Sequence, residues 1–413
     1  MSFNNNLEGF NIVRSFWYQF WNPTVGNFTS MVPVNGTKQN GTFDAWSVSV
    51  AVHALVDATR VYPEENKEVL DMAIRATLKY RSNENGGCYC VEEYRRGNKD
   101  INFDDDAQIA SAFICAYEVT GNREYLKLAK KIVDFLLTGW NDDKKSKLEG
   151  GMMWHVTHLY VASCATSMTA VALMRMLKHT EDENEKKKLY NFAKKCINWI
   201  FDKMIAPDDR LVWDGCGKYS DVIDKQKWTY NVGVPLTAIS YLYKYDHDKS
   251  WIDRAKLLAE GATDRGRPLF CRDYPDYHKR YWRDPSYFIQ LLIEGLVDYI
   301  ETFGDVAPEQ TINCCKNEIK RHLSYFRKYM FDPNDGLYFM NFEINRLSDD
   351  IYDKYKHQFG GNKKFDPWEK DRQHVNGDIS NRPMAKCLIG SASAARIFLQ
   401  GGRLFPTMDP PKV

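Results

Sequence analysis

Residues 103–120 read FDDDAQIASAFICAYEVT and place three consecutive aspartates, Asp104, Asp105 and Asp106, directly in front of an apolar helical run. Adjacent carboxylates repel one another, so this arrangement needs a physical reason. One reason is capping, because carboxylates are favourable at the positive end of a helix macrodipole. The other reason is chemistry, because two carboxyl groups held close together titrate apart, and one can act as an acid while the other stays ionised.

Helical periodicity of apolar residues extends over the whole chain, and the aspartate run precedes the fourth of about twelve such segments. The segments are 7–21, 45–62, 67–81, 107–120, 123–140, 161–180, 185–205, 232–245, 250–263, 286–303, 310–330 and 391–400. Short links such as Gly121-Asn122 alternate with long loops rich in Gly, Asp, Trp and Tyr. A short link makes an antiparallel helical hairpin, and a long loop carries the chain to the next hairpin.

This alternation predicts an all-α fold, a six-hairpin (α/α)6 barrel of about twelve helices with the long loops on one face. Apolar helical hairpins must bury a face against their neighbours, and closure into a ring of inner and outer helices does this without loose ends. No strand-rich half and no Pro/Ser-rich linker divides the chain. We therefore expect a single domain over residues 1–413, with its functional site on the loop face.

The composition excludes several classes of function. With 56 basic and 55 acidic residues the formal net charge is +1, which is not the footprint of a nucleic-acid-binding protein. No apolar stretch reaches the roughly 18 residues needed to span a bilayer. The polar N-terminal residues lack the layout of a signal peptide, so we expect a cytoplasmic protein from the chain as written, and a secreted one if a leader precedes it.

Metal and cofactor motifs are absent from the sequence. The ten cysteines include no CxxC pair, and the nine histidines show no zinc-type spacing with them. There is no P-loop, dinucleotide-binding fingerprint, HExxH helix or GxSxG elbow. We expect neither a metal ion nor a cofactor.

Aromatic and polar residues, several of them acidic, recur at the expected loop-face ends of the inner helices. They are Trp46, Phe103, Asp106, Trp154, His155, Asp214, Trp228, Tyr230, Asn231 and Trp282, together with Asp104 and Asp105. Sugar faces stack on aromatic rings, and a glycosidase needs a pair of carboxyl groups. This set indicates a carbohydrate-binding cleft with Asp104 and Asp105 as its catalytic pair.

Several motifs, in this order and spacing, resemble glycoside hydrolase family 76, the α-1,6-mannanase family with an (α/α)6 barrel. They are Phe103-Asp104-Asp105-Asp106-Ala107, Ala116-Tyr117-Glu118-Val119-Thr120-Gly121, Tyr125-Leu126, Gly150-Gly151-Met152-Met153-Trp154, Trp228-Thr229-Tyr230-Asn231-Val232-Gly233-Val234 and Leu242-Tyr243. The resemblance extends over roughly residues 40 to 300. One departure is the start of the sixth helical segment, Val161-Ala162-Ser163-Cys164, where the family often has asparagines.

The resemblance implies a retaining hydrolase of α-1,6-linked mannan or mannose-rich oligosaccharides, with Asp104 as nucleophile and Asp105 as general acid/base. Retaining enzymes hold these groups about 5–5.5 Å apart. Neighbouring Cα atoms are about 3.8 Å apart, so adjacent side chains can reach that spacing, although an extended backbone would splay them further. A mannan transglycosidase, a sugar epimerase or isomerase, and a non-catalytic glycan-binding protein are the alternatives on the same barrel.

Each candidate also has a structural interpretation. Asp105 and Gln108 have the spacing of a capping box, and Asp106 is a cap or a hydroxyl contact. The two tryptophans Trp154 and Trp228 either stack on sugars or pack the barrel. The remaining alternatives are helix capping for Tyr230 and Asn231, a turn for Asp214 and a structural role for His155.

Overall fold

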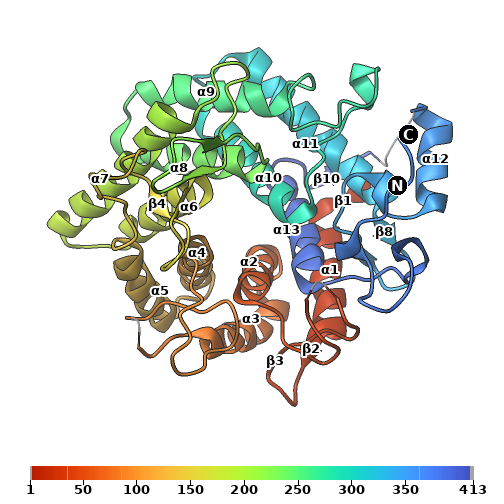
Figure 1. The fold of residues 1–413 in the computed structure, drawn as a ribbon, viewed down its shortest axis with the longest axis horizontal. Helices are drawn as coiled ribbons and strands as arrows, with labels where there is room; N and C mark the ends of the chain where they lie inside the picture. Colours follow the sequence, from red (N-terminus) through yellow and green to blue (C-terminus); the bar gives the residue numbers. More distant parts are fainter. Residues whose placement is uncertain (1, 35, 85, 362, 410–413) are drawn as a thin grey trace.

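Six inner helices form a closed ring at the centre of the molecule (Figure 1). The computed structural model describes residues 2–34, 36–84, 86–361 and 363–409. In it each inner helix packs against the next, and the last packs against the first. The inner helices are α2 (Ala45–Val61), α4 (Phe103–Thr120), α6 (Ser163–Leu177), α8 (Tyr230–Asp246), α10 (Ser286–Phe303) and α13 (Leu388–Leu404).

Six outer helices surround this ring, each against an inner helix. They are α1 (Asn5–Phe20), α3 (Pro63–Thr77), α5 (Arg123–Leu136), α7 (Glu183–Trp199), α9 (Ser250–Thr263) and α11 (Glu309–Tyr329). The order of inner and outer helices is the one that the sequence predicts, and the (α/α)6 barrel is confirmed. All ten cysteines lie in the described residues as free thiols, and no described helix is long and apolar enough to cross a membrane.

Inner and outer helices differ in how apolar residues are distributed around them. Every residue of α6 is buried, including its polar Ser, Thr and Arg side chains. On α5 the buried residues lie along one stripe, Tyr125, Ala129, Ile132, Val133 and Leu136. A helix that is apolar all round belongs inside a protein, and an amphipathic one belongs at its surface. The sequence thus specifies which helix of each hairpin faces the barrel axis.

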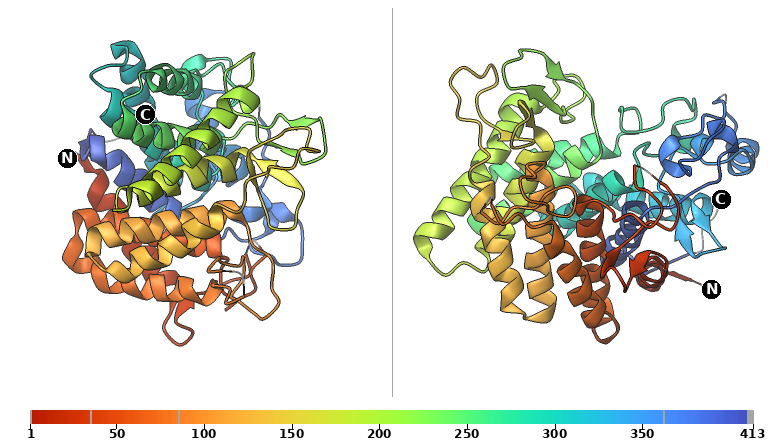
Figure 2. Two further views of the ribbon diagram at one scale, coloured as in Figure 1. Left: turned by 90° about the vertical axis from the view of Figure 1, so that its left-hand side faces the viewer. Right: turned by 60° about the horizontal axis from the view of Figure 1, so that its bottom comes forward.

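The long connections lie at one end of the barrel and contain short strands (Figure 2). An antiparallel four-stranded sheet joins two of these connections in the order β4-β5-β6-β7. Its strands are β4 (Met152–Met153), β5 (Tyr160–Ala162), β6 (Gly215–Gly217) and β7 (Ile223–Asp224). Three two-stranded pairs are β1 (Phe3–Asn4) with β10 (Thr407–Met408), β2 (Trp21–Asn22) with β3 (Asn27–Phe28), and β8 (Phe331–Asp332) with β9 (Leu337–Tyr338).

Two features differ from the sequence-based expectation. A further helix, α12 (Asp349–Phe359), lies in the long connection between α11 and α13. Helix α4 begins at Phe103 rather than Ala107, so the three aspartates lie inside its first turn. The N-cap residue is Asn102, which means that Asp105 and Gln108 do not form a capping box. The helix starts early because the Phe103 N–H is bound by the Trp154 carbonyl, 2.9 Å away, while the dipole favours carboxylates in the first turn.

Helices α8 and α10 approach each other at backbone distance. A β-carbon built on Gly295 of α10 would lie 2.1 Å from the carbonyl oxygen of Gly233 on α8. A β-carbon on Gly233 would in turn lie 2.3 Å from the carbonyl oxygen of Leu291. Both positions therefore require glycine, and the Gly in the segment Trp228–Val234 has a packing role.

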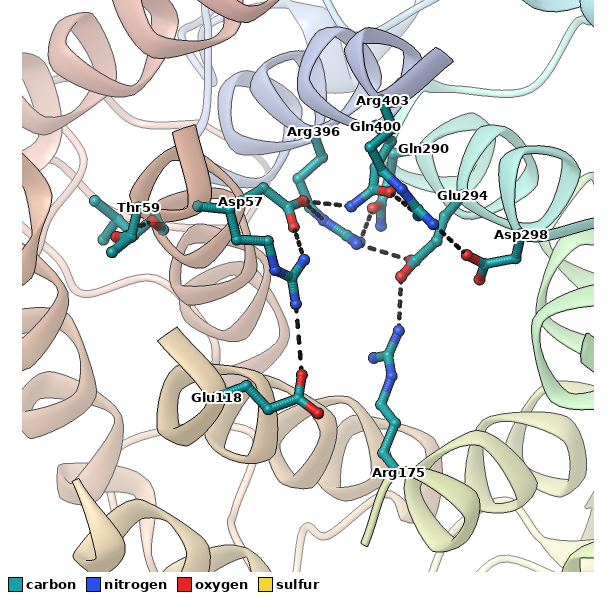
Figure 3. A network of polar contacts seen from close by, with 12 residues as sticks. Asp57, Thr59, Glu118, Arg175, Gln290, Glu294, Asp298, Arg396, Gln400 and Arg403 are labelled. Carbon is teal, nitrogen blue, oxygen red and sulfur yellow. Dashed lines mark hydrogen bonds and ion pairs between the residues drawn. The ribbon is translucent and has the colours of Figure 1, made fainter. Parts of the chain in front are cut away.

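A buried ion-pair network links four inner helices across the barrel (Figure 3). Arg396 of α13 binds Asp57 of α2 at 3.0 Å and Glu294 of α10 at 2.7 Å. Glu294 also binds Arg175 of α6 at 2.7 Å, and Gln400 donates to Asp57 at 2.8 Å. Each of these charges has a partner of opposite sign, which is the condition for burying them. The network fixes the inner ring below the loop face.

Candidate active site

A cavity of about 690 Å³ opens on the loop face of the barrel. The inner helices and the β4–β7 sheet supply its walls. Its lining residues are Asp44, Trp46, Val91, Asn102, Asp104, Asp105, Gln108, Trp154, His158, Tyr160, Ala162, Cys164, Met168, Asp214, Asp224, Trp228, Tyr230, Phe288 and Leu291. Neither Lys nor Arg occurs in this set, which suits an uncharged ligand. Seven residues predicted from the sequence line the cavity: Asp104, Asp105, Trp46, Trp154, Asp214, Trp228 and Tyr230.

Asp104 receives hydrogen bonds from two loop-face residues of neighbouring elements. The indole Nε1 of Trp154 lies 3.1 Å from Oδ2 of Asp104, and Sγ of Cys164 lies 3.4 Å from the same oxygen. Burial raises the pKa of Asp104 to about 6, and these two hydrogen bonds limit the rise because they stabilise the ionised form. Asp104 is therefore the carboxyl group of the pair that ionises more readily.

Asp105 is surrounded by more carboxylate groups than Asp104 is. Burial raises the pKa of Asp105 well above its ordinary value, and the carboxylates of Asp104 and Asp44 raise it further. A single weak hydrogen bond from Nδ2 of Asn102, at 3.3 Å, acts in the opposite direction. Two adjacent carboxyl groups thus differ in protonation, with Asp105 holding its proton to higher pH than Asp104.

Asp106 lies outside the cavity. It is fully buried, and its Oδ1 accepts the Tyr89 N–H at 2.9 Å, which anchors the preceding loop to α4. Burial raises the pKa of Asp106 well above its ordinary value, and the nearby Asp105 and Asp104 add to this effect. The third aspartate thus binds the backbone of its own chain.

A further acidic residue, Asp214, lines the same cavity as the aspartate pair. Oδ2 of Asp214 accepts the Tyr160 hydroxyl at 2.9 Å, and Oδ1 accepts Nδ2 of Asn231 at 3.1 Å and the Tyr230 hydroxyl at 3.4 Å. Burial raises the pKa of Asp214, while the hydrogen bonds from Tyr160, Asn231 and Tyr230 counteract the increase. These three donors hold the Asp214 carboxylate in a fixed orientation.

Aromatic rings form one continuous side of the cavity. Phe288 is at its centre, with ring centroids 6.1 Å from Trp46, 5.6 Å from Trp228 and 4.2 Å from Tyr230. Trp154 lies apart from them, beside Asp104. Rings of this kind provide flat apolar surface for stacking against sugar faces.

Besides Asp106, four sequence-predicted site residues do not line the cavity. Phe103 stacks on Phe135 with ring centroids 4.9 Å apart, and Asn231 is buried beneath Asp214. His155 is buried and accepts the Ile101 N–H at 3.1 Å. Trp282 is fully buried, stacked on His322 at 3.6 Å, and its Nε1 donates to the Ala262 carbonyl. The contacts of Phe103, His155 and Trp282 are thus structural, and Asn231 binds Asp214 of the lining.

The structure also places residues at the cavity that the sequence argument did not select. They include Asp44, His158, Tyr160, Cys164 and Phe288. Asp44 and Cys164 stand at the starts of inner helices, which is the signal that identified Trp46 and Asp104. His158 and Tyr160 belong to the β4–β5 hairpin, whose strands are too short to show a period. Among the described residues, no group of three or more His, Cys, Asp or Glu is placed to hold a metal ion.

Comparisons with known proteins agree with this geometry. The sequence profile of Glycosyl hydrolase family 76 matches residues 10–321. The chain belongs to this family. It is therefore a glycoside hydrolase, and the family that the motifs indicated is confirmed.

Two curated relatives align to different shares of the chain. The Meiotically up-regulated gene 191 protein of Schizosaccharomyces pombe is 30% identical over 98% of this chain and 93% of its own length. The Mannan endo-1,6-alpha-mannosidase DCW1 of Candida albicans is 21% identical over 52% of this chain and 48% of its own. A solved structure shares the fold with a TM-score of 0.70 and 16% identity, covering 97% of this chain and 100% of that one. It is an inactive variant, with two aspartates changed to asparagine, of the α-1,6-mannanase GH76A of Salegentibacter sp. HEL1_6 in complex with α-1,6-mannotriose.

Proposed function

We propose that this protein is a retaining glycoside hydrolase of α-1,6-linked mannan or mannose-rich oligosaccharides, with Asp104 as nucleophile and Asp105 as general acid/base. One observation carries the proposal. The two adjacent carboxyl groups line one cavity in different environments, Asp104 with two donors and Asp105 with two acidic neighbours. A retaining mechanism needs one ionised and one protonated carboxyl group at the same bond.

In the first step the Asp104 carboxylate attacks the anomeric carbon of the bound sugar. The glycosidic C–O bond breaks as the new C–O bond to Asp104 forms, and the proton of Asp105 passes to the departing oxygen. Trp154 and Cys164 hold the attacking carboxylate in place through its Oδ2. The product of this step is a covalent glycosyl-enzyme.

In the second step Asp105, now ionised, removes a proton from an incoming hydroxyl group. The resulting oxygen attacks the anomeric carbon and releases Asp104, which restores both groups to their starting state. Water as the incoming group gives hydrolysis. A sugar hydroxyl gives transglycosylation by the same residues, and the products identify which of the two takes place.

The substrate assignment rests on the cavity lining and on the relatives. The aromatic side provides stacking surface, Asp214 provides a hydroxyl acceptor, and the lack of Lys and Arg in the lining suits a neutral glycan. Proteins named for α-1,6-mannan share the family, and one of them binds α-1,6-mannotriose in an inactive double Asp-to-Asn variant. These likenesses support α-1,6-linked mannose as the first substrate to test.

The alternative classes have less support in the geometry. A sugar isomerase or epimerase on this barrel would need histidine bases at the cavity, and His158 is the one histidine in the described lining. A non-catalytic binding protein has no need of two desolvated carboxyl groups side by side, because their repulsion costs stability.

The test is turnover of α-1,6-mannan by the wild-type protein, with the anomeric configuration of the first product followed by NMR. The α-anomer is expected to appear first, because two displacements restore the original configuration. Asp104→Asn and Asp105→Asn are each expected to abolish turnover of the polysaccharide. With an aryl mannoside that has a good leaving group, Asp105→Asn should recover the first step and Asp104→Asn should not.

Asp106→Asn is the matched control, because it makes the same change at the next position of α4 but outside the cavity. It should retain most of the activity. The proposal fails if wild-type protein leaves every α-mannan and manno-oligosaccharide intact, or if both catalytic variants remain fully active. Circular dichroism and thermal unfolding should show that all three variants are folded.

A further inference from the structure

Cys164 occupies an unusual place for a buried cysteine. It is the second residue of α6, it is 5% exposed, and it lines the cavity. Its Sγ lies 3.4 Å from Oδ2 of Asp104, which is within range for a thiol donor to a carboxylate. The other described cysteines in helices pack elsewhere in the core or, like Cys314, lie at the surface.

The backbone fixes the direction of this thiol. Ala162 ends strand β5 and is the N-cap of α6, so Cys164 lies in the first turn of this inner helix. The strand and the helix together fix the backbone position of Cys164. The Thr166 hydroxyl binds both the Ala162 carbonyl, at 2.7 Å, and the Met152 N–H, at 2.8 Å, which secures that turn against strand β4. Because Cys164 contacts Asp104 from the first turn of α6, the positive end of the α6 dipole lies near Asp104.

We propose that Cys164 is a positioning residue for Asp104, whose thiol hydrogen bond holds the carboxylate in its ionised, attacking orientation. A covalent adduct on this sulfur would remove the donor and fill the space beside Asp104, so the same contact makes the reaction sensitive to thiol modification. The catalytic part of this inference rests on the proposed function, whereas the coupling between the thiol and the carboxylate does not.

The coupling must operate among several other ionisable groups. Those that act on Asp104 or Cys164 are Asp105 on α4, Tyr230 on α8, Tyr160 on β5, and Asp214 before β6, while Asp44 before α2 acts on the neighbouring Asp105. Burial, followed by the charges of Asp104 and Asp214, raises the pKa of the Cys164 thiol well above its ordinary value. Removing the charge of Asp104 should therefore ease ionisation of Cys164, and removing the thiol should hinder ionisation of Asp104.

The first experiment measures alkylation of Cys164 by iodoacetamide from neutral to alkaline pH, with the modified peptide identified by mass spectrometry. In this reaction the thiolate sulfur forms a bond to the reagent carbon and iodide leaves. In Asp104→Asn the midpoint of the rate profile should move to lower pH. At fixed pH below that midpoint the rate should rise roughly threefold or more, because one pKa unit is about tenfold in thiolate.

Two controls separate charge coupling from altered access. The exposed Cys314 in the same sample should react at an unchanged rate, and Asp106→Asn should leave the Cys164 profile unchanged. A shift of the midpoint with an unchanged plateau supports the coupling. An identical Cys164 profile in wild type and Asp104→Asn overturns the inference, whether or not the protein hydrolyses mannan.

The second experiment compares Cys164→Ser, Cys164→Ala and Cys196→Ser by the pH dependence of kcat/KM on α-1,6-mannan. Serine keeps a hydrogen-bond donor, so the acid limb of the kcat/KM profile of Cys164→Ser should stay in place. Alanine removes the donor, so the acid limb of Cys164→Ala should move to higher pH by about 0.5–1 unit. Cys196→Ser is the control for placing a hydroxyl at a buried cysteine, because Cys196 lies on the outer helix α7.

Wild type should lose activity when iodoacetamide treatment has alkylated Cys164, as shown by mass spectrometry, and Cys164→Ser should keep its activity under the same treatment. The inference is overturned if the alanine and serine variants have the same acid limb as wild type. Lack of turnover in wild-type protein would reject the proposed function and leave the alkylation result as the test of the contact.

Discussion

The indole Nε1 of Trp154 lies 3.1 Å from Oδ2 of Asp104. A residue for which the sequence left sugar stacking and barrel packing open therefore donates a hydrogen bond to the expected nucleophile. The main chain strengthens this link, because the Trp154 carbonyl binds the first N–H of α4. Trp154 thus connects the β4–β5 hairpin to the catalytic turn at two points.

Phenylalanine at position 154 separates the two roles. Trp154→Phe keeps an aromatic face and removes the donor, so the pKa of Asp104 should rise and the acid limb of kcat/KM should move to higher pH. Trp154→Ala removes the ring as well and should also weaken mannotetraose binding by about 1–3 kcal/mol, measured by calorimetry in an Asp104→Asn background. Equal binding by all three proteins would mean that the ring does not contact sugar.

Trp228 gives an independent test of the aromatic side. It lies in the lining across Phe288 from Trp46, with no hydrogen bond to the aspartate pair. Trp228→Ala should raise KM for α-1,6-mannan and leave the pH limbs in place, because stacking contributes binding and not proton transfer. A variant with an unchanged KM and a changed kcat would show that Trp228 does not stack on the sugar.

The pH dependence of the wild-type protein follows from the two carboxyl groups. In the proposed mechanism, activity requires Asp104 ionised and Asp105 protonated. Because the pKa of Asp104 is raised to about 6, kcat/KM should fall as pH drops below that value. The pKa of Asp105 is raised well above its ordinary value, so a second loss should follow as pH rises through it. Asp105→Asn with an activated aryl mannoside should keep the acid limb and lose the alkaline limb.

The helices could be predicted because their apolar periods are long. The predicted segment 286–303 coincides with α10, and most other helices differ from prediction by a few residues at the ends. Helix α12 was missed because it buries only Tyr352 and Tyr355, too little for a clear apolar face. The β4–β5 hairpin was missed because two or three residues show no alternation.

The site could be predicted only in part, because the sequence pattern gives the position of a residue along a helix but not the neighbours of its side chain. Position on the loop face could be inferred from the sequence, and this placed Asp104, Asp105 and Trp154 correctly at one end of the barrel. Whether a side chain faces the cavity or the wall behind it depends on contacts distant in sequence. Trp282 stacks on His322 of α11, and His155 binds the backbone at Ile101, and neither partner is recognisable from local pattern.

Close packing of α8 on α10 gives a prediction about stability. Gly295→Ala places a β-carbon 2.1 Å from the Gly233 carbonyl oxygen, which side-chain movement cannot relieve. We expect a loss of about 1–3 kcal/mol or more in the free energy of unfolding, because the helices must separate. Gly261→Ala on the outer helix α9 is the control, because its nearest neighbour is the end of the Leu211 side chain, at 3.0 Å. Denaturant unfolding should show a clearly smaller effect there.

The buried network gives the last prediction. Arg396→Met leaves Glu294 and Asp57 without their shared cation, and removing one partner of a buried pair costs about 3–5 kcal/mol. Burial alone would raise the pKa of Glu294, but Arg396 and Arg175 hold it well below its ordinary value. The network therefore stabilises the fold above the ordinary Glu pKa, and this contribution is lost as pH falls through the lowered value.

Thermal unfolding across pH tests this argument. The deficit of Arg396→Met should be largest near neutral pH and should shrink in acid, where protonated Glu294 no longer needs the cation. Lys67→Ala breaks the exposed pair with Glu64 and should change stability by about 1 kcal/mol or less at every pH. A single transition is expected throughout, since the network joins α2, α6, α10 and α13 in one ring. A pH-independent deficit would show that Arg396 acts through packing, and two separate transitions would contradict the single-domain prediction.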